Sequence, residues 1–534
     1  MSCASRVASS SPVLIGCDVG TGAVKTIVCG ADGTLLGRCA AEHPMHHPQP
    51  GWAENDPEDW YLGLIQTIRA AVAASAVDPA RIAGLAVVCQ REPVVLIDAA
   101  GAAMAPAISW TDQRATAEAG DIAARLGRER LIATTGMTPS AGMSLAHLLW
   151  FQRHRPGLWR SVRRIWFAKD YLLHRLTGCA ATDLTTPSRS GLLDVARQEW
   201  SEEICAAFGI DPGLLPLIRA QPWQRAGGLP AGSARQLGLR PGVPVAMGGS
   251  DDAAATLGCG AIEPGQVSVG TGTAANWRTV LAGWRPDRSG RGDVSPHVVP
   301  GRFIHEVAIE STGSSLRWLR DVLIGPSSGQ AGFDELISSA AKVPCGADGL
   351  LCFPFVDGAA RAPRYTAGAR GAYLGAVSGH TRGHLAKATL EGIAFQYRAT
   401  LALAGHRAAD GMSNPGDAIG TGDGEARNAV WNQLKADVLG VPLRVPRITD
   451  LAAAGAAILA GIAGGVFADA AAGVAALVSW DRHYEPDPQR TAVYAKLSAG
   501  YELAYTRLAS TFGQDQRPAQ AGQITSGTNQ GTRA

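Results

Sequence analysis

The chain has 534 residues, and its 48 Lys and Arg residues nearly balance its 46 Asp and Glu residues. That length is too great for one hydrophobic core and predicts two large domains with a cleft between them. The formal net charge is only +2, without a basic block, which argues against a nucleic-acid-binding protein. We therefore expect a small-molecule ligand.

The cysteines predict a reducing environment. All 10 are scattered through the chain, several in apolar stretches, and no C-x-x-C pair occurs, so neither zinc sites nor disulfides are indicated. The N-terminus lacks the apolar core of a signal peptide, and no apolar run reaches the ~20 residues of a membrane-spanning helix. These features predict a soluble cytoplasmic protein with no membrane partner. They leave a homodimer open.

The first half of the chain begins with strands. From Val13, short β-rich runs with turn residues between them predict a hairpin or meander. Residues 57–76 predict an amphipathic helix that begins at a proline and carries acids in its first turn. Apolar strand candidates follow at 82–89 and 93–98. Strands that pass into alternating helix and strand predict an α/β fold.

A similar unit recurs in the second half. Residues 18–22 (DVGTG) follow an apolar strand, and residues 269–273 (VGTGT) precede another β-like run at 276–281. Two such units predict a duplicated domain, although chance is a rival explanation in a chain with 65 glycines. Ala-rich helices are expected near 451–465, with a last helix near 494–510. The polar tail from residue 513 is expected to be disordered.

The two Gly-Thr turns are candidate phosphate sites. Glycine lets backbone N–H groups converge on one point, and a threonine hydroxyl adds a donor. Asp18, at a strand end, could hold hydrated Mg²⁺, and Lys25 could face a phosphate or only solvent. Two ordinary hairpins are the alternative. The candidate phosphate-binding residues of these turns are Gly20, Thr21, Gly22, Gly270, Thr271, Gly272 and Thr273.

Paired acids mark a candidate catalytic segment. Asp251 and Asp252 follow small residues and precede an Ala-rich helical run. One carboxylate could accept the proton of an attacking hydroxyl while the other binds a neighbouring hydroxyl. Capping of the helix is the alternative role.

Two further clusters point to ligand contacts. Arg91 and Glu92 lie between apolar strands and could grip vicinal hydroxyls, with a solvated surface ion pair as the alternative. Trp110 could offer its face to a carbon chain, or belong to the core. Residues 419–428 combine a strand with a glycine-rich turn before a helix, which suits a nucleotide or a plain turn.

With these motifs in this order, the chain resembles the FGGY carbohydrate kinases from about Val13 to Ser510. The resemblance implies an α/β fold of two actin-like (RNase H-like) ATPase domains, at 13–258 and 265–510, with the tail 511–534 outside them. It also implies ATP and Mg²⁺ in the cleft, with Asp251 as the catalytic base.

The resemblance also implies which residues meet each ligand. The adenosine-side loop would contribute Gly422, Gly424 and Asn428, and the acceptor would meet Arg91, Glu92, Trp110, Asp251 and Asp252. The loop is about two residues longer than the family's usual form, and Asp252 replaces the family's usual Asn or Gln.

The implied acceptor is a small sugar or polyol. Residues 51–57 (GWAENDP) resemble xylulokinases, which favours a ketopentose such as D-xylulose. The triplet Gln90-Arg91-Glu92 instead resembles glycerol kinase, and an Arg-Glu pair also occurs in autoinducer-2 kinase, so glycerol, erythritol and autoinducer-2 remain alternatives. A catalytically idle ATP-binding sensor of the same fold, or less favourably an Hsp70-like ATPase, is the alternative from another class.

Overall fold

The first half of the chain is organised around a seven-stranded sheet of order β13-β14-β5-β1-β2-β3, with β15 beside β5. The computed structural model describes residues 11–512 except 360, 362, 367 and 409–417. Neighbours β1, β2 and β3 are antiparallel, whereas β5 and β14 continue the sheet in parallel. The strands are β1 (Val13–Val19), β2 (Ala23–Gly30), β3 (Leu35–Glu42), β5 (Ile82–Cys89), β13 (Arg225–Gly228), β14 (Pro244–Ala246) and β15 (Gly249–Ser250).

Helix α1 (Pro57–Ser75) packs against β2 and β3, and α6 (Ala168–Thr177) packs against β5. Asp56 begins α1, because its carboxylate accepts a hydrogen bond from the Glu58 amide at 2.9 Å. The predicted helix at 57–76 and the predicted strands at 82–89 and 93–98 are confirmed, the last as β6 (Val94–Ile97).

An inserted, mainly helical region lies between β6 and β13. It has its own buried apolar cluster, which includes Leu148, Phe151 and Phe208. Its elements are β7 (Ala107–Ile108), α2 (Thr116–Leu126), α3 (Arg128–Thr135), α4 (Ser144–His154), α5 (Pro156–Ser161), β8 (Arg164–Phe167), β9 (Ala181–Asp183), β10 (Leu193–Asp194), β11 (Glu199–Trp200), α7 (Glu202–Phe208) and β12 (Leu217–Ala220).

The second half repeats the first. Its seven-stranded sheet has the order β18-β19-β17-β16-β22-β23-β24, and β19, β17 and β16 are antiparallel neighbours that β22 and β23 continue in parallel. The predicted duplication is therefore confirmed. The strands are β16 (Val267–Thr271), β17 (Ala275–Leu281), β18 (Asp293–Pro296), β19 (Phe303–Ile309), β22 (Ile419–Asp423), β23 (Leu443–Pro446) and β24 (Trp480–Tyr484).

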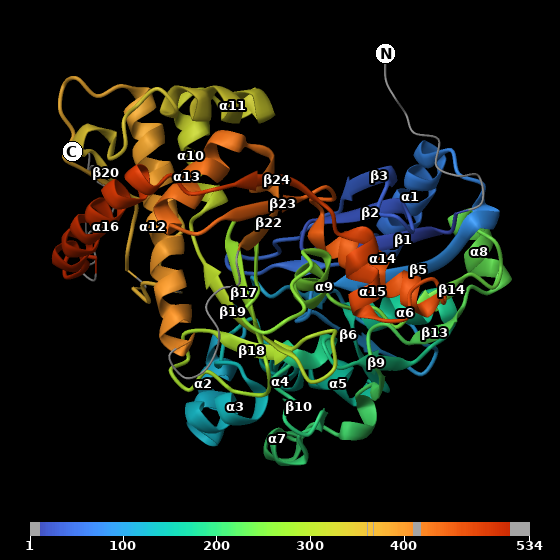
Figure 1. The fold of residues 1–534 in the computed structure, drawn as a ribbon. Coiled ribbons are helices and arrows are strands. Elements are labelled where there is room, and N and C mark those ends of the chain that lie inside the picture. Colours follow the sequence, from blue (N-terminus) through green and yellow to red (C-terminus); the bar gives the residue numbers. More distant parts are fainter. Residues whose placement is uncertain (1–10, 360, 362, 367, 409–417, 513–534) are drawn as a thin grey trace, which may run out of the picture.

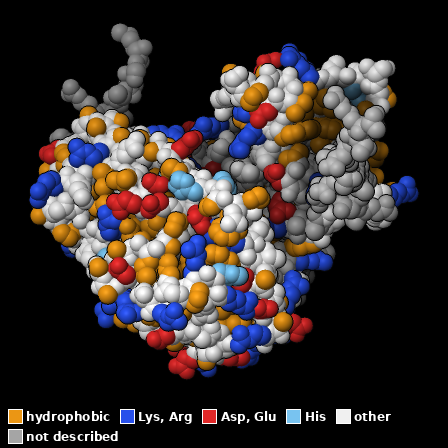
Figure 2. Space-filling model, turned by 180° about the vertical axis from the view of Figure 1, so that it is seen from behind, with side chains coloured by type: hydrophobic (Ala, Val, Ile, Leu, Met, Phe, Trp, Pro, Cys, Tyr) orange, Lys and Arg blue, Asp and Glu red, His pale blue; other side chains and the backbone are white. Residues whose placement is uncertain are grey.

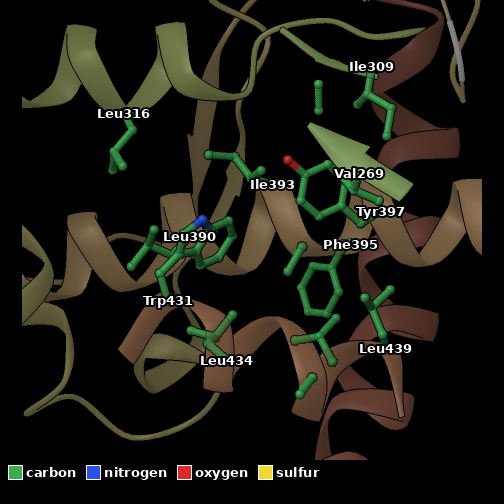
Figure 3. Packing of buried hydrophobic residues seen from close by; sticks show 14 of the residues in the cluster. Val269, Ile309, Leu316, Leu390, Ile393, Phe395, Tyr397, Trp431, Leu434 and Leu439 are labelled. Atoms are coloured by element: carbon green, nitrogen blue, oxygen red, sulfur yellow. The ribbon is translucent and has the colours of Figure 1, made fainter. Parts of the chain in front are cut away.

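A large aromatic and aliphatic core joins this second sheet to its helices. Figure 3 shows Tyr397, Phe395 and Trp431 packed among aliphatic side chains from sheet and helices. The helices are α10 (Gly313–Leu323), α11 (Gly329–Ala340), α12 (Arg382–Ala408), α13 (Ala429–Leu439) and α16 (Pro488–Ala509). The last of these confirms the predicted final helix.

Two helices connect the halves. Helix α14 (Leu451–Ala463), with α15 (Ala470–Leu477) after it, lies beside β1 and β5 of the first sheet and against α9 (Asp251–Gly258) (Figure 1). Glycines allow this approach: a Cβ on Gly455 would collide with the Ala254 carbonyl, and one on Gly16 with the Ala453 carbonyl. The predicted domain limits stay a prediction, since packing crosses them here.

The described cysteines form no disulfide, and six of these nine are buried. Burial raises the pKa of Cys17 and Cys352 to about 12, so both remain neutral thiols. No helix in the described parts of the chain is long and apolar enough to span a membrane. The predicted disordered tail, from 513 onward, lies outside the described residues.

Candidate active site

Three carboxylates lie near the boundary between the two halves. Asp18 is the next-to-last residue of β1, Asp251 begins α9, and Asp423 ends β22. The charges of Asp423 and Asp252 both contribute to the pKa of Asp18, so the strand ends of the two sheets are close together. Seen from behind, a hollow separates the larger lobe from the smaller one (Figure 2).

Asp251 is free of a capping role. Ser250 caps α9 instead, its hydroxyl accepting a hydrogen bond from the Ala253 amide at 3.3 Å. The Asp252 amide donates to Asp251 Oδ1 at 2.9 Å. Burial, and then the charge of Asp252, raise the pKa of Asp251 well above its usual range. Asp251 therefore has the proton affinity that a general base needs.

Asp252 is held by cations on both oxygens. Oδ1 accepts from Arg278 Nε at 2.7 Å and from Asn276 Nδ2 at 3.1 Å, and Oδ2 accepts from Arg91 Nη2 at 2.6 Å. Burial alone would raise the pKa of Asp252, but the Arg278 and Arg91 guanidiniums outweigh it and hold that pKa below its usual range. A substrate hydroxyl that contacts Asp252, as predicted, would have to share these carboxylate oxygens with Arg278, Asn276 and Arg91.

Arg91 links the halves. Besides Asp252, it binds Glu306 of β19 in a bidentate pair at 2.8 and 2.7 Å. Glu92 pairs with Arg189 at 2.7 Å, and Arg189 also pairs with Asp293 of β18. Arg91 and Glu92 are both buried, so the alternative of a solvated surface ion pair is wrong.

Trp110 fixes the first Gly-Thr turn. Its Nε1 donates to Thr21 Oγ1 at 2.9 Å, and the half-buried indole is not a core residue, so the predicted contact of its face with a substrate stays a prediction. The two side chains share a cavity of about 190 Å³ that Gln90, Asp251 and Asn276 also line. The other charged residues of its lining are Arg91, Glu92, Arg189, Asp252, Asp293, Glu306 and Arg361. The cavity brings together all the predicted acceptor-binding residues.

The first turn is closed by backbone contacts. The Gly20 amide donates to the Ala23 carbonyl at 3.0 Å. His43 bonds both glycines: its ring Nε2 lies 3.0 Å from the Gly20 carbonyl oxygen, and its backbone amide donates to the Gly22 carbonyl at 3.1 Å. Lys25 Nζ lies 3.9 Å from Asp18 Oδ2. This turn therefore keeps its shape without a ligand.

Asp18 fits a cation. Its Oδ1 is buried and forms no hydrogen bond, and burial raises its pKa to about 6 despite the charge of Lys25. No three acidic, His or Cys side chains of the described residues converge as a metal cage. Such a single carboxylate suits Mg²⁺, which keeps most of its water and binds phosphate oxygens.

The second turn splits into buried and exposed parts. A Cβ on Gly270 would lie 2.5 Å from Asp423 Oδ2, so a larger residue there would displace the Asp423 carboxylate. Thr271 ends β16 with its hydroxyl 3.1 Å from the Tyr397 hydroxyl, inside the core. Gly272 and Thr273 are exposed at the tip, where the Thr273 carbonyl accepts from Ser314 at 3.0 Å. Only this tip presents side chains and backbone to a ligand.

The glycine-rich loop at residues 419–428 has one glycine packed against a helix and another that is exposed. A Cβ on Gly422 would collide with Leu451, so this glycine serves the contact with α14. Gly424 is exposed. Asn428 caps α13, because its Oδ1 accepts from the Trp431 amide at 3.1 Å, which leaves its Nδ2 for a ligand.

Several site residues carried no signal in the sequence. Arg278 and Glu306 lie in adjacent strands, as register partners of β17 and β19, within no recognisable motif. Asp423 was visible within the glycine-rich turn GTGDG, but not as a partner of Asp18. Asp293 and Arg189 meet only because the inserted region folds back on β18.

Comparison with known proteins defines the class. The model of the FGGY family of carbohydrate kinases, N-terminal domain, matches residues 13–258, and that of the C-terminal domain matches residues 265–464. The chain belongs to the FGGY family of carbohydrate kinases. The kinase prediction and the predicted fold of two actin-like α/β domains are thereby confirmed.

Individual relatives are similar over most of their length. A xylulose kinase of Lactococcus lactis is 30% identical over 496 residues, covering 92% of this chain and 96% of that protein. A glycerol kinase of Citrifermentans bemidjiense is 32% identical over 497 residues, covering 89% and 95%. The crystal structure of xylulose kinase from Rhodospirillum rubrum superposes with a TM-score of 0.83 at 30% identity, covering 94% of this chain and 100% of that one.

Proposed function

We propose that this carbohydrate kinase transfers the γ-phosphoryl group of ATP to a hydroxyl of a ketopentose, with D-xylulose as the first candidate. The observation that carries the proposal is Asp251, a carboxylate of raised proton affinity facing a polar cavity between the two halves. Similarity to xylulose kinases supports the choice of sugar.

In this proposal the acceptor lies in the polar cavity. Trp110 offers its apolar face to the carbon chain, while Arg91 and Glu92 approach the hydroxyls of the acceptor. Asp251 accepts the hydroxyl proton as the oxygen attacks the γ-phosphorus, the bond to the β-phosphate oxygen breaks, and ADP leaves. The raised pKa of Asp251 makes this transfer more favourable than it would be to an ordinary carboxylate.

The phosphate chain of ATP would lie between the two turns. The backbone N–H of Gly22, with the hydroxyls of Thr21 and Thr273, would hold its oxygens. The N–H groups of Gly20 and Gly272 bond the carbonyls of Ala23 and Ala274 and so would shape the two turns around the phosphates. Lys25 would add a positive charge beside them. Gly424 and Asn428 would meet the adenosine side. Asp18 would hold Mg²⁺ through water, and the ion would neutralise phosphate charge.

A polyol is the second candidate acceptor. The triplet Gln90-Arg91-Glu92 matches glycerol kinase, and the glycerol kinase of Citrifermentans bemidjiense is 32% identical to this chain, although over a smaller share of it than the xylulose kinase of Lactococcus lactis. The cavity of about 190 Å³ is small enough to favour short acceptors of either kind. A cytoplasmic location and a homodimer stay predictions.

A coupled assay of ADP release tests the proposal. The panel comprises D-xylulose, D-ribulose, glycerol, erythritol and autoinducer-2, each with MgATP. We expect the highest kcat/KM with D-xylulose. A higher value with glycerol would move the assignment to a polyol kinase, and ATP binding without turnover on any acceptor would support the idle sensor instead.

A further inference from the structure

A large cavity lies outside the interdomain cleft. It occupies about 830 Å³ on the inserted region and the edge of the first sheet. None of its lining residues lines the cavity around Asp251. Its volume falls within the range of about 300–1,000 Å³ that small-molecule sites occupy. We call it the arginine cavity, after Arg164, Arg219 and Arg225 in its wall.

The charged residues that line the arginine cavity are all arginines. Arg164, Arg219 and Arg225 come from three different strands, and no described residue of the lining is acidic. Within the described parts of the chain, none of the three forms an ion pair, and Arg225 donates only to the Gly227 carbonyl, at 3.3 Å. This contrasts with the cleft, where Arg91 and Arg278 are paired with carboxylates. Unpaired guanidiniums facing one cavity attract an anion.

Another part of the lining is apolar. Trp200 donates from Nε1 to the Pro216 carbonyl at 2.9 Å and stacks on Phe167 with an interplanar angle of 14°. Leu217 in the same wall is 53% exposed, although it is a large aliphatic residue. A fixed indole beside exposed aliphatic surface suits the flat apolar part of a ligand.

We propose that the arginine cavity binds a small organophosphate. A dianionic phosphate ester lies among Arg164, Arg219 and Arg225, and its apolar or ring portion lies against Trp200 and Pro216. Guanidiniums match phosphate geometry by paired hydrogen bonds, and three of them balance a dianion better than a monoanion.

Calorimetric titration of the full chain tests the proposal with 1-naphthyl phosphate as the probe. We expect saturable binding that weakens at least about tenfold in Arg164→Gln/Arg219→Gln, because each substitution removes charged hydrogen bonds to the phosphate. Arg155→Gln, an exposed arginine outside the cavity, should leave the affinity unchanged. Neutral 1-naphthol should bind at least about tenfold more weakly, and added NaCl should weaken binding of the phosphate.

Equal affinity of wild type and double variant would overturn the proposal, because the probe would then lie elsewhere, for example in the cleft. Equal affinity for 1-naphthol would overturn the phosphate assignment. The melting temperature and the turnover of sugar should match between variant and wild type. If the double variant loses its fold, Arg219→Gln carries the same comparison, with Arg219→Lys expected to restore much of the binding.

Discussion

Asp251 and Asp252 are neighbours in sequence but have opposite surroundings. Asp252 is neutralised by Arg91 and Arg278, whereas Asp251 faces the cavity and forms no ion pair with any described residue. Two adjacent carboxylates thus have pKa values moved in opposite directions, one raised and one lowered. Such a pair separates a proton acceptor from a permanently charged anchor.

The base role of Asp251 predicts a loss of turnover when its carboxylate is removed. In Asp251→Asn we expect kcat to fall by roughly two orders of magnitude or more, as loss of a general base does. The affinity for MgADP, measured by calorimetry, should stay close to wild type. Near-normal turnover in this variant would remove Asp251 from the proposed role.

In Asp252→Asn we expect the pH dependence of kcat/KM to shift. The negative charge that raises the pKa of Asp251 disappears, and Arg91 loses one of its neutralising partners. Both changes lower the pKa of Asp251, and the base works only when deprotonated. The acid limb of kcat/KM against pH should therefore move to lower pH.

The matched control for this shift is Asp121→Asn, a surface acid paired with Arg153. It should leave the acid limb in place. If the acid limb of kcat/KM stays in place in Asp252→Asn, or moves to higher pH, the charge of Asp252 does not raise the pKa of Asp251 as described.

Helices α9 and α14 cross with their backbones almost in contact. Gly455 faces the Ala254 carbonyl, and Gly258 faces the Leu451 carbonyl, so neither position has room for a side chain. This contact also sets where Asp251 lies, because α9 begins with that residue. Packing between these two helices thus supports the geometry of the site.

Gly455→Ala should lower the free energy of unfolding by about 1–3 kcal/mol, the usual cost of overpacking. Urea denaturation followed by circular dichroism measures the change. The matched control is Gly500→Ala in α16, where a Cβ would meet nothing within 4 Å. That substitution should stabilise the chain by about 0.5–1 kcal/mol, because alanine favours a helix. A neutral Gly455→Ala would show that the crossing can relax.

Local signals predicted the elements well. The helix from Pro57, the strands around Asp18 and the Ala-rich α14 follow from periodicity, turn residues and capping. The cleft charges could not be predicted in the same way. Arg278 and Glu306 acquire their roles from strand register and from the approach of Arg91 in the other half, which no local pattern encodes.

Arg91 connects the two halves of the molecule through buried charge. It is bonded to Asp252 beside the first sheet and to Glu306 in the second, and all three residues are buried. In Arg91→Met the two carboxylates keep their burial and lose this partner. We expect the free energy of unfolding to fall by about 3–5 kcal/mol, measured by urea denaturation.

The control is Arg130→Met, which breaks the exposed pair with Glu203. Its effect on the free energy of unfolding should be far smaller than that of Arg91→Met, because water already screens that exposed pair. Similar losses in both variants would mean that the buried pair across the cleft is worth no more than a surface pair.

The position of α14 has a consequence for how the chain can be divided. This helix comes late in the sequence, yet it covers apolar residues of strands near the N-terminus, including Leu14 and Val88. A polypeptide ending at residue 258 would leave that face of its sheet open to water, and the remaining fragment would carry an unmatched apolar helix. The two pieces should therefore aggregate separately and regain activity only when they are produced together.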